Sequence, residues 1–424
     1  MQFTPLNLAR IVVWSGFALL LLLAPLAFPQ AGSLSLLSQI GTMMIFALSY
    51  NMLLGQGGML SFGHAVYSGL GAFFAVHAMN LSQTGMLIPV SLIPLVGGFA
   101  GMMFGILFGY LTTKKSGNTF GMITLGMVEL VAASSLMFPS FFGGEGGISA
   151  NRVQGQAFLG ITFGPQIEVY YLIAVYLLLS TCAMFAFTQT PLGRILNAVR
   201  DNPERVEFLG YSSQWVRFLT LVLSAFFAGI AGGLGAINFE IVGAENVSAI
   251  RSGAVLLFTF IGGVGFFFGP LIGAVIGIFL SVVLSDFTNA WQLYLGIFFI
   301  LMVMYAPGGV ASLVMLFLRI VSAGLLGRVW KVLLAQLSSA LLAFAGLVVL
   351  IEMLYQRTLD SANGSLIKLF GRQIDSANPL PWVLAFAMLL IGAILFYRGK
   401  ASFSVQWGAA MQLALQVGRQ GGVR

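Results

Sequence analysis

Runs of apolar residues, each close to twenty residues long, recur along most of the chain. They lie near residues 11–29, 34–54, 58–79, 86–111, 119–141, 167–188, 216–238, 253–268, 269–286, 288–306, 329–351 and 380–397. About twenty apolar residues suffice for an α-helix to cross the hydrocarbon core of a bilayer. The pattern therefore predicts an all-α fold, a polytopic transmembrane helical bundle with about 10–12 spans.

Glycine interrupts some of these runs. The run at 58–79 and the pair covering 253–286 are rich in glycine, which predicts discontinuous or re-entrant helices there. In other runs glycine recurs every four residues, at Gly97, Gly101, Gly105 and Gly109, and again at Gly269, Gly273 and Gly277. Such spacing lines one helix face with small residues, so we interpret these faces as packing seams rather than ligand sites.

The composition excludes a soluble protein. Hydrophobic residues make up 59% of the 424 positions and charged residues 7%, and no Asp, Glu, Lys or Arg occurs from Ile11 to Thr113. The net charge is +7, but the basic residues are few and scattered, so no nucleic-acid partner is predicted. The first run has some signal-peptide character because it ends in prolines, but its length favours an uncleaved first helix.

The positions of the basic residues predict the topology. With a cytoplasmic N-terminus, all the basic clusters face the cytoplasm: Lys114, Lys115, Arg194, Arg200, Arg205, Arg319, Arg328, Lys331, Arg398 and Lys400. The opposite loops, 142–166 and 239–252, then hold only Arg152 and Arg251 as bases. This distribution follows the positive-inside rule and predicts that both termini are cytoplasmic.

Signatures of catalysis are absent from the sequence. It contains no GxxxxGK[ST] phosphate loop and no HExxH motif, and the two histidines, His64 and His77, have no plausible nucleophile and acid beside them. The single cysteine, Cys182, lies in an apolar run and is expected to be buried and inert. We therefore expect no catalytic residue, no metal site and no cofactor, and the chain is not expected to be an enzyme.

The most charged stretch is TPLGRILNAVRDNPERVEFLGY, residues 190–211. Thr190 suits a helix N-cap, Pro191 suits the first helical position, and Pro203 ends the helix. Between them an apolar stripe recurs at helical spacing, at Leu192, Ile195, Leu196 and Val199. An amphipathic helix on the cytoplasmic membrane surface is predicted. From these residues alone, docking to a soluble partner and simple joining of two spans are equally open.

A second candidate is the segment from Asn51 to His64, which places polar residues and glycines among apolar spans. Its candidate residues for a solute path are Asn51, Gly55, Gln56, Gly57, Gly58, Ser61 and His64. Irregular backbone at membrane depth is tolerated where it is buried in protein or lines a water-filled cavity, and such segments carry solute sites in transporters. The alternative is a glycine-rich turn at the membrane face. Glu129 is a carboxylate within a span, where an unpaired charge is costly, so it is also a candidate for the solute path. Its alternative role is a structural hydrogen bond to a neighbouring helix.

Several motifs together resemble a known family. ALSYNMLLGQGGMLSFGHAVYSGLGAFFA, ITLGMVELV with GGEGGIS, the 190–211 stretch, SAIRSGAVLLFTFIGGVGFFFGPLIGA and APGGV occur in the order found in LivM-like permeases of branched-chain amino acid ABC importers. The resemblance covers roughly residues 35–312. It implies a bacterial inner-membrane location and four kinds of partner: a homologous second permease subunit, two cytoplasmic ATP-binding subunits, a periplasmic solute-binding protein and membrane lipid.

The resemblance also assigns roles to residues. The 190–211 helix would couple to the ATP-binding subunits through Arg194, Arg200, Asp201, Asn202 and Glu204. Phe208 departs from the family pattern, which has a small residue there. The expected organisation is an N-terminal segment, 1–34, a permease core, 35–312, and a C-terminal extension, 313–424, that lies beyond the usual end of the family.

The expected function is ATP-driven inward transport of branched-chain amino acids or similar small polar solutes. Urea, amides and small carboxylates are alternative substrates within the same class. The alternative from another class is an ion-coupled secondary transporter that uses Glu129 or Asp286.

Overall fold

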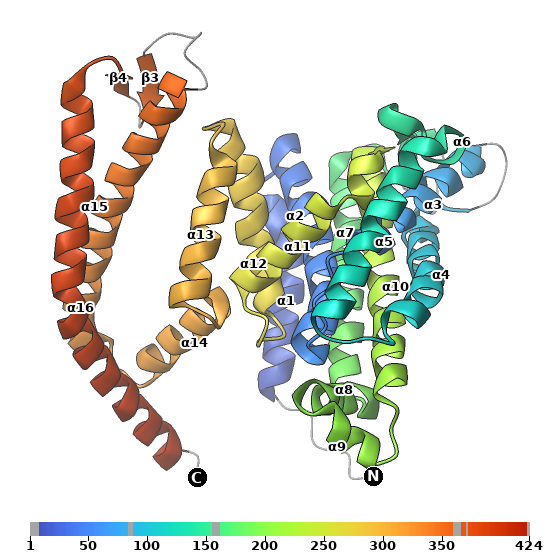
Figure 1. Cartoon of the computed structure of the whole chain (residues 1–424), viewed down its shortest axis with the longest axis horizontal. Coiled ribbons are helices and arrows are strands. Elements are labelled where there is room, and N and C mark those ends of the chain that lie inside the picture. Colours follow the sequence, from blue (N-terminus) through green and yellow to red (C-terminus); the bar gives the residue numbers. More distant parts are fainter. Residues whose placement is uncertain (1–7, 84–87, 155–161, 359–365, 370–371, 422–424) are drawn as a thin grey trace. The chain divides into compact units, whose positions relative to one another are not determined.

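A computed structural model describes residues 8–83, 88–154, 162–358, 366–369 and 372–421 (Figure 1). The contact pattern divides the chain into two units. The first unit comprises residues 1–282 with 299–311, and the second comprises 283–298 with 312–424. Almost all of the described residues are helical, which confirms the predicted all-α class.

Eight helical segments in the described ranges are long and apolar enough to cross a membrane. They are Ala31–Gln56, Val90–Thr112, Asn118–Met137, Gln166–Gln189, Ser213–Phe239, Gly269–Asp286, Val329–Thr358 and Pro379–Leu413. A bent pair of helices, Trp291–Tyr305 and Gly309–Ser322, gives a ninth if it is one span, and Ile11–Ala27 and Ala249–Gly262 are shorter apolar helices. The polytopic bundle predicted from the apolar runs is confirmed.

The first unit contains α1 to α12 with short 3-10, π and β elements. In chain order these are α1 (Leu8–Ala27), α2 (Ala31–Asn51), the π-helical η1 (Met52–Gln56), α3 (Ala65–Gln83), η2 (Val90–Leu92), α4 (Ile93–Thr112), α5 (Asn118–Met137), α6 (Pro139–Phe142), η3 (Gly144–Gly146), β1 (Ile148–Ser149), η4 (Arg152–Gln154), α7 (Gln166–Gln189), α8 (Pro191–Asp201), α9 (Pro203–Phe208), α10 (Ser213–Phe239), β2 (Ile241–Val242), η5 (Ala244–Val247), α11 (Ala249–Gly262) and α12 (Gly269–Ile278). The π-helical η6 (Phe279–Val283) and η7 (Leu284–Asp286) then cross into the second unit.

Helix α10 forms the centre of the first unit. In its most apolar eighteen-residue stretch, 78% of the residues are buried, the largest share among the eight described spans. The glycine face of α4 packs against it: a Cβ atom at Gly229 of α10 would collide with the backbone oxygen of Gly97 and the backbone of Gly98. Gly101 meets the backbone of Ala225 and Gly229 in the same way. The packing seam predicted from the four-residue glycine spacing is therefore confirmed.

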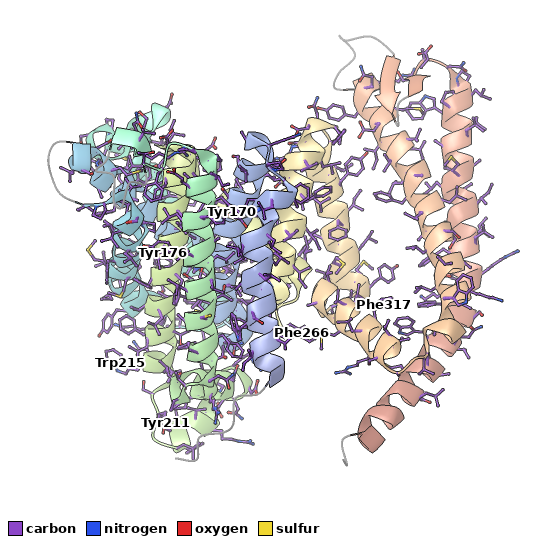
Figure 2. All side chains as sticks on the ribbon, turned by 180° about the vertical axis from the view of Figure 1, so that it is seen from behind. Tyr170, Tyr176, Tyr211, Trp215, Phe266 and Phe317 are labelled. Atoms are coloured by element: carbon purple, nitrogen blue, oxygen red, sulfur yellow. The ribbon has the colours of Figure 1, made fainter. Side chains whose placement is uncertain are left out.

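The two ends of the first unit differ as the topology predicts. At one end, β1 pairs antiparallel with β2 and joins Ile148 to Val242, so the segments 148–149 and 241–242 of the two predicted outer loops lie together. Helices α8 and α9 lie at the opposite end (Figure 1). Tyr211 and Trp215 are also at that end, each about half exposed (Figure 2). Aromatic side chains concentrate at membrane–water interfaces, which suits this position.

The second unit contains most of the C-terminal extension. Helices α13 (Trp291–Tyr305) and α14 (Gly309–Ser322) cross the boundary between the units; α15 (Leu326–Thr358), β3 (Leu366–Leu369), β4 (Arg372–Asp375) and α16 (Pro379–Gly421) follow. β3 and β4 form an antiparallel pair, and α15 packs along α16. A Cβ atom at Gly346 of α15 would meet the backbone of Leu389 of α16. The two further spans predicted for the extension are present as α15 and α16.

A carboxylate fixes one contact inside the second unit. Glu352 of α15 accepts hydrogen bonds from the hydroxyls of Thr288 and Tyr294, each at 2.7 Å. Two hydroxyl donors of this kind lower the cost of a carboxylate within an apolar helix. Glu352 was not among the predicted site residues; its position directly after the apolar run 329–351 was the available signal.

Candidate functional site

The chain is unwound between α2 and α3. Helix α2 continues into the π-helical η1, and residues 58–64 are not helical before α3 begins at Ala65. Gly58 has φ +63°, a left-handed conformation that favours glycine. The predicted break is confirmed, but the predicted run at 58–79 begins too early, because its first seven residues lie in the break.

Local hydrogen bonds hold this unwound segment in place. The hydroxyl of Tyr50 donates to the carbonyl of Ser61 at 2.9 Å, and the Gly63 N–H donates to Ser61 Oγ at 3.3 Å. From α5, Thr124 Oγ1 accepts from the Phe62 N–H at 3.1 Å. At membrane depth, backbone groups that leave a helix need such partners, since water is absent.

His64 is fully buried in an aromatic cluster. Its ring stacks on Phe46 with centroids 5.4 Å apart, and its Nε2 lies 3.0 Å from the hydroxyl of Ser49. His64 Nδ1, Tyr67 OH and Asn51 Oδ1 are buried without a hydrogen-bond partner in the described part of the chain. Asn51, Ser61 and His64 are therefore all polar residues buried within the bundle.

Helices α8 and α9 match the predicted amphipathic segment. Thr190 Oγ1 accepts from the Gly193 N–H at 3.2 Å, and Asn202 Oδ1 accepts from the Arg205 N–H at 2.9 Å, so each helix has an N-cap. The apolar stripe of α8 faces the bundle, with Leu196 and Val199 buried. The predicted coupling residues Arg194, Arg200, Asp201, Asn202 and Glu204 are all exposed.

Arg200 also reaches back to the unwound segment. Its Nη1 donates to the carbonyl oxygen of Gly55 at 2.6 Å, while its Nε donates to Asp201 Oδ1 at 3.1 Å. The aliphatic part of the Arg200 side chain lies against Gly58, and Leu196 lies against Gly57, so a Cβ atom at either glycine would contact α8. The structure thus brings together two groups of predicted residues that are far apart in the sequence.

A third segment meets them at Gly55. A Cβ atom at Gly55 would collide with the backbone oxygen of Val264 on one side and with Asn51 Oδ1 on the other. Val264 lies in the connection between α11 and α12, the second break predicted from glycine, where Gly263 has φ +114°. No sequence pattern pointed to this contact. We call the meeting of Gly55, Arg200 and Val264 the Gly55 junction.

The structure places Arg251 in a helix and not in the predicted loop. It was expected in a loop on the outer side, but it belongs to the first turn of α11, where its N–H donates to Ser248 Oγ at 3.3 Å. The next residue, Ser252, accepts from the Ala65 N–H at 2.9 Å through its hydroxyl. The charge at Arg251 ends the apolar run in sequence, so the start of a short helix was read as loop.

The acidic candidates stand apart from this cluster. Glu129 is on an exposed face of α5, away from Thr124 and Met127, which face the unwound segment, and no described residue pairs with it. Asp286 is exposed at the end of η7. Across the described residues, no group of three or more His, Cys, Asp or Glu side chains could hold a metal ion.

Cys182 was predicted to be buried, and this prediction is wrong. The cysteine is exposed on α7. Its neighbour Thr181 is fully buried, so Thr181 lies on the inward face of α7 and Cys182 on the outward face. In an apolar span, composition is similar on both faces and does not reveal which face is inside.

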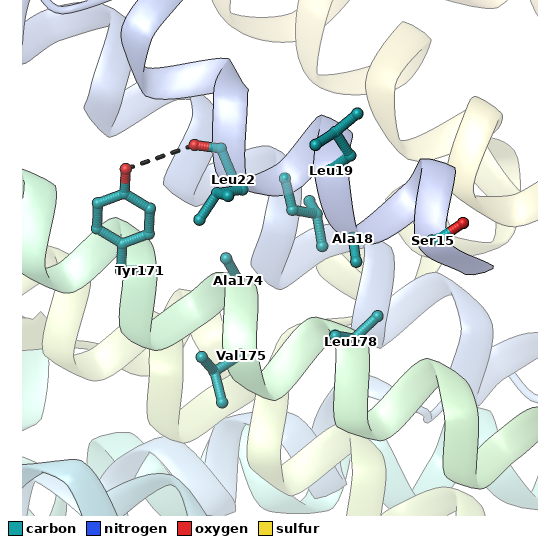
Figure 3. Close-up of a pocket in the computed structure, with 9 residues that line it drawn as sticks. Ser15, Ala18, Leu19, Leu22, Tyr171, Ala174, Val175 and Leu178 are labelled. Atoms are coloured by element: carbon teal, nitrogen blue, oxygen red, sulfur yellow. Dashed lines mark hydrogen bonds between the residues drawn. The ribbon is translucent and has the colours of Figure 1, made fainter. Parts of the chain in front are cut away.

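A separate groove lies between α1 and α7 (Figure 3). Its lining is almost entirely aliphatic, with Ala18, Leu19 and Leu22 from α1 facing Ala174 and Leu178 from α7. Such a lining suits an acyl chain and offers no charge to a polar solute. We do not assign this groove to the solute path.

Comparisons with known proteins find relatives among transport permeases. The chain is similar to the high-affinity branched-chain amino acid transport system permease protein LivM of Salmonella typhimurium, at 27% identity over 317 residues, covering 69% of this chain and 74% of the relative. LivM of Escherichia coli is 26% identical over the same shares of both chains. The fructose import permease protein FrcC of Rhizobium meliloti is 26% identical over 205 residues, 45% of this chain and 55% of the relative. No solved structure matches.

The family model that matches describes the permease component of branched-chain amino acid transport systems and covers residues 32–307. That range includes the unwound segment, α8 and α9, and the connection after α11. With its apolar helices, the chain is a multi-pass protein of the inner membrane. The chain belongs to the family of permease components of branched-chain amino acid transport systems.

Proposed function

We propose that this chain is the membrane-spanning permease subunit of an ATP-driven importer that moves branched-chain amino acids or similar small polar solutes inward. The observation that carries the proposal is the hydrogen bond from Arg200 of α8 to the carbonyl of Gly55 in the unwound segment. It gives a helix at the cytoplasmic end a direct contact with broken backbone in the bundle. LivM, to which the chain is similar, is named for branched-chain amino acid transport.

The partners are a homologous second permease subunit, two cytoplasmic ATP-binding subunits and a periplasmic solute-binding protein. Helices α8 and α9 supply the surface for the ATP-binding subunits, with Arg194, Asp201, Asn202 and Glu204 exposed upon it. Beside these, Phe208 is 89% exposed, more than a large apolar side chain normally is unless a partner covers it. A mixed-charge surface with an exposed aromatic side chain suits a protein partner.

Transport requires two conformations that nucleotide binding favours differently. We assign Asn51, Gly55, Gln56, Gly57, Gly58, Ser61 and His64 to the part of the solute path that changes between them, and Glu129 to a surface that a partner subunit covers. A shift of α8 on the ATP-binding subunit reaches this segment through Arg200. Residues 35–312 are the transporting core in this proposal, preceded by 1–34 and followed by an added helical extension, 313–424.

Co-purification tests the proposal. The tagged chain, co-expressed with the ATP-binding subunits of the importer, is expected to retain them, and Phe208→Ser or Glu204→Arg is expected to reduce their recovery at least tenfold. Phe138→Ser is the matched control, since Phe138 is 57% exposed and lies at the far end of α5 from α8. Failure of the unmodified chain to retain an ATP-binding subunit overturns the proposal.

The competing function is ion-coupled secondary transport through Glu129 or Asp286. Vesicles containing only the purified chain distinguish the two. Solute uptake driven by a proton or sodium gradient in these vesicles supports the secondary transporter, and uptake that needs the ATP-binding subunits and ATP supports the importer.

A further inference from the structure

The C-terminal extension carries positive charge that no acidic side chain balances. Residues 287–351 and 376–424 contain no Asp or Glu. Four exposed basic residues of the second unit lie in these stretches: Arg319, Lys331, Arg398 and Lys400. Both ion pairs among the described residues belong to the first unit, so none of these four side chains is part of one. The four positions therefore present charge of one sign.

Lys331 and Arg398 stand at the same end of the two spans of the extension. Each is followed or preceded by an uncharged stretch, 332–351 in α15 and 379–397 in α16. The two helices run antiparallel, and Gln336 Nε2 of α15 donates to the carbonyl of Phe396 of α16 at 3.0 Å. At 1.5 Å of rise per residue from that contact, Lys331 and Lys400 lie within about one helical turn of each other along the helix axes. Both spans therefore leave the apolar layer at the same level, on basic residues.

Three helices pack together at this end of the second unit. Ile320 of α14, Val329 of α15 and Ala410 of α16 form a buried cluster, and Trp407 packs against it (Figure 1). Trp330, beside Lys331, is 45% exposed. Tryptophan is enriched at membrane–water interfaces, where its ring lies at the level of the lipid headgroups. The basic residues are therefore held on a packed structure at headgroup level, and not on a loose tail.

We propose that these four residues form a surface that binds the headgroups of anionic phospholipids in the leaflet that the predicted topology makes cytoplasmic. Clusters of four or more basic residues directly beside a membrane span attract anionic lipids, and each adds about fivefold to the affinity. Long basic side chains at the ends of spans reach the headgroups while their stems stay in apolar surroundings. All four residues lie outside 32–307, the range that the family model covers, so the surface belongs to the extension.

The test measures the binding of two phospholipids to the purified full chain in detergent by native mass spectrometry. Phosphatidylglycerol carries a net negative charge, whereas phosphatidylcholine with the same acyl chains has the same phosphate and a choline cation that balances it. The apparent Kd for phosphatidylglycerol is expected to be lower by about tenfold or more, because several basic residues contribute together. Equal Kd values for the two lipids overturn the proposal.

Paired variants locate the binding surface. Lys331→Gln with Lys400→Gln is expected to weaken phosphatidylglycerol binding by about tenfold or more and to leave phosphatidylcholine binding unchanged, which also shows that the variant is folded. Lys114→Gln with Lys115→Gln is the matched control, because it removes two exposed lysines of the first unit on the side predicted to be the same. Equal losses in the two double variants mean attraction by overall charge and overturn the proposed surface.

Two further arms complete the experiment. If Lys331→Gln with Lys400→Gln does not fold, Arg319→Gln with Arg398→Gln must weaken phosphatidylglycerol binding instead, and an unchanged Kd overturns the surface. Glycerol 3-phosphate, a headgroup without acyl chains, is expected not to displace the lipid at equal concentration; displacement identifies a site for free phosphate and overturns the membrane assignment. No partner subunit or ATP is needed, so the result is independent of the import function.

Discussion

Arg200 and Gly55 are 145 positions apart in the sequence and joined by a hydrogen bond of 2.6 Å. The donor is a guanidinium group whose side chain is 41% exposed at the end of a surface helix, and the acceptor is a backbone carbonyl in a π-helical turn. A hydrogen bond with one charged partner contributes about 1.5–3 kcal/mol. If α8 moves away from the bundle, either this hydrogen bond breaks or the backbone of η1 moves together with α8.

Arg200→Met should separate docking from transport. The variant keeps the aliphatic packing on Gly58 but loses the bond to the Gly55 carbonyl. We expect the ATP-binding subunits to co-purify while ATP-dependent uptake in proteoliposomes falls at least tenfold, since about 2 kcal/mol of coupling is lost. Arg194→Met, on the same helix but without the bond, should weaken co-purification without this selective loss; equal effects of both variants would contradict the role of Arg200.

Gly58→Ala should lower stability. Gly58 has φ +63°, and an added Cβ atom would press on the Arg200 side chain. A non-glycine residue in the left-handed region costs about 1–2 kcal/mol, so the unfolding midpoint should fall. Gly126→Ala is the control, because nothing lies within 4 Å of its Cβ position on α5. Equal midpoints for the two variants would show that the unwound segment is not fixed in this conformation.

Gly229→Ala should disturb the seam between α4 and α10. Its Cβ atom would collide with the backbone of Gly97 and Gly98, which is not free to turn away as a side chain could. Overpacking of this kind costs about 1–3 kcal/mol. Gly235→Ala on the same helix meets nothing within 4 Å and should leave the unfolding midpoint unchanged or raise it. A seam that tolerates Gly229→Ala as well as Gly235→Ala is not closely packed.

Arg152→Gln should open the loop that precedes α7. Arg152 Nε donates to the carbonyl of Phe163 at 2.8 Å, and its Nη1 donates to the carbonyls of Ile237 and Asn238 at the end of α10. Amide hydrogen exchange in residues 148–153 should accelerate by on the order of tenfold or more, as local opening becomes easier. Arg205→Gln on α9 is the control, and unchanged exchange at 148–153 would show that β1 and β2 hold the loop alone.

Much of this fold follows from local sequence rules. Apolar runs gave the spans, and Thr190 with Pro191 placed the start of α8, because caps and proline act within one helical turn. The four-residue glycine spacing on α4 indicated a packing face for the same reason. These predictions needed no knowledge of which helix lies beside which.

The site itself is only partly encoded in such rules. The unwound segment was predicted because glycines and amides interrupt the apolar pattern of a membrane helix. Its contact with Val264 was not predicted, because the two glycine-rich stretches share no sequence pattern. Arg251 was misplaced because a charged residue ends a hydropathy run whether it lies in a loop or in the first turn of a buried helix. Cys182 was misplaced because the two faces of an apolar helix have similar composition.

The Gly55 junction determines how stress passes through the bundle. Side chains between two helices can change rotamer when the helices shift, which absorbs part of the movement. Where no side chain separates the two backbones, close packing transmits the strain directly. At Gly55 the backbone of η1 touches the backbone at Val264 directly, with Arg200 bonded to the same residue. We therefore expect a displacement of α8 at the cytoplasmic surface to reach both broken helices through this one residue.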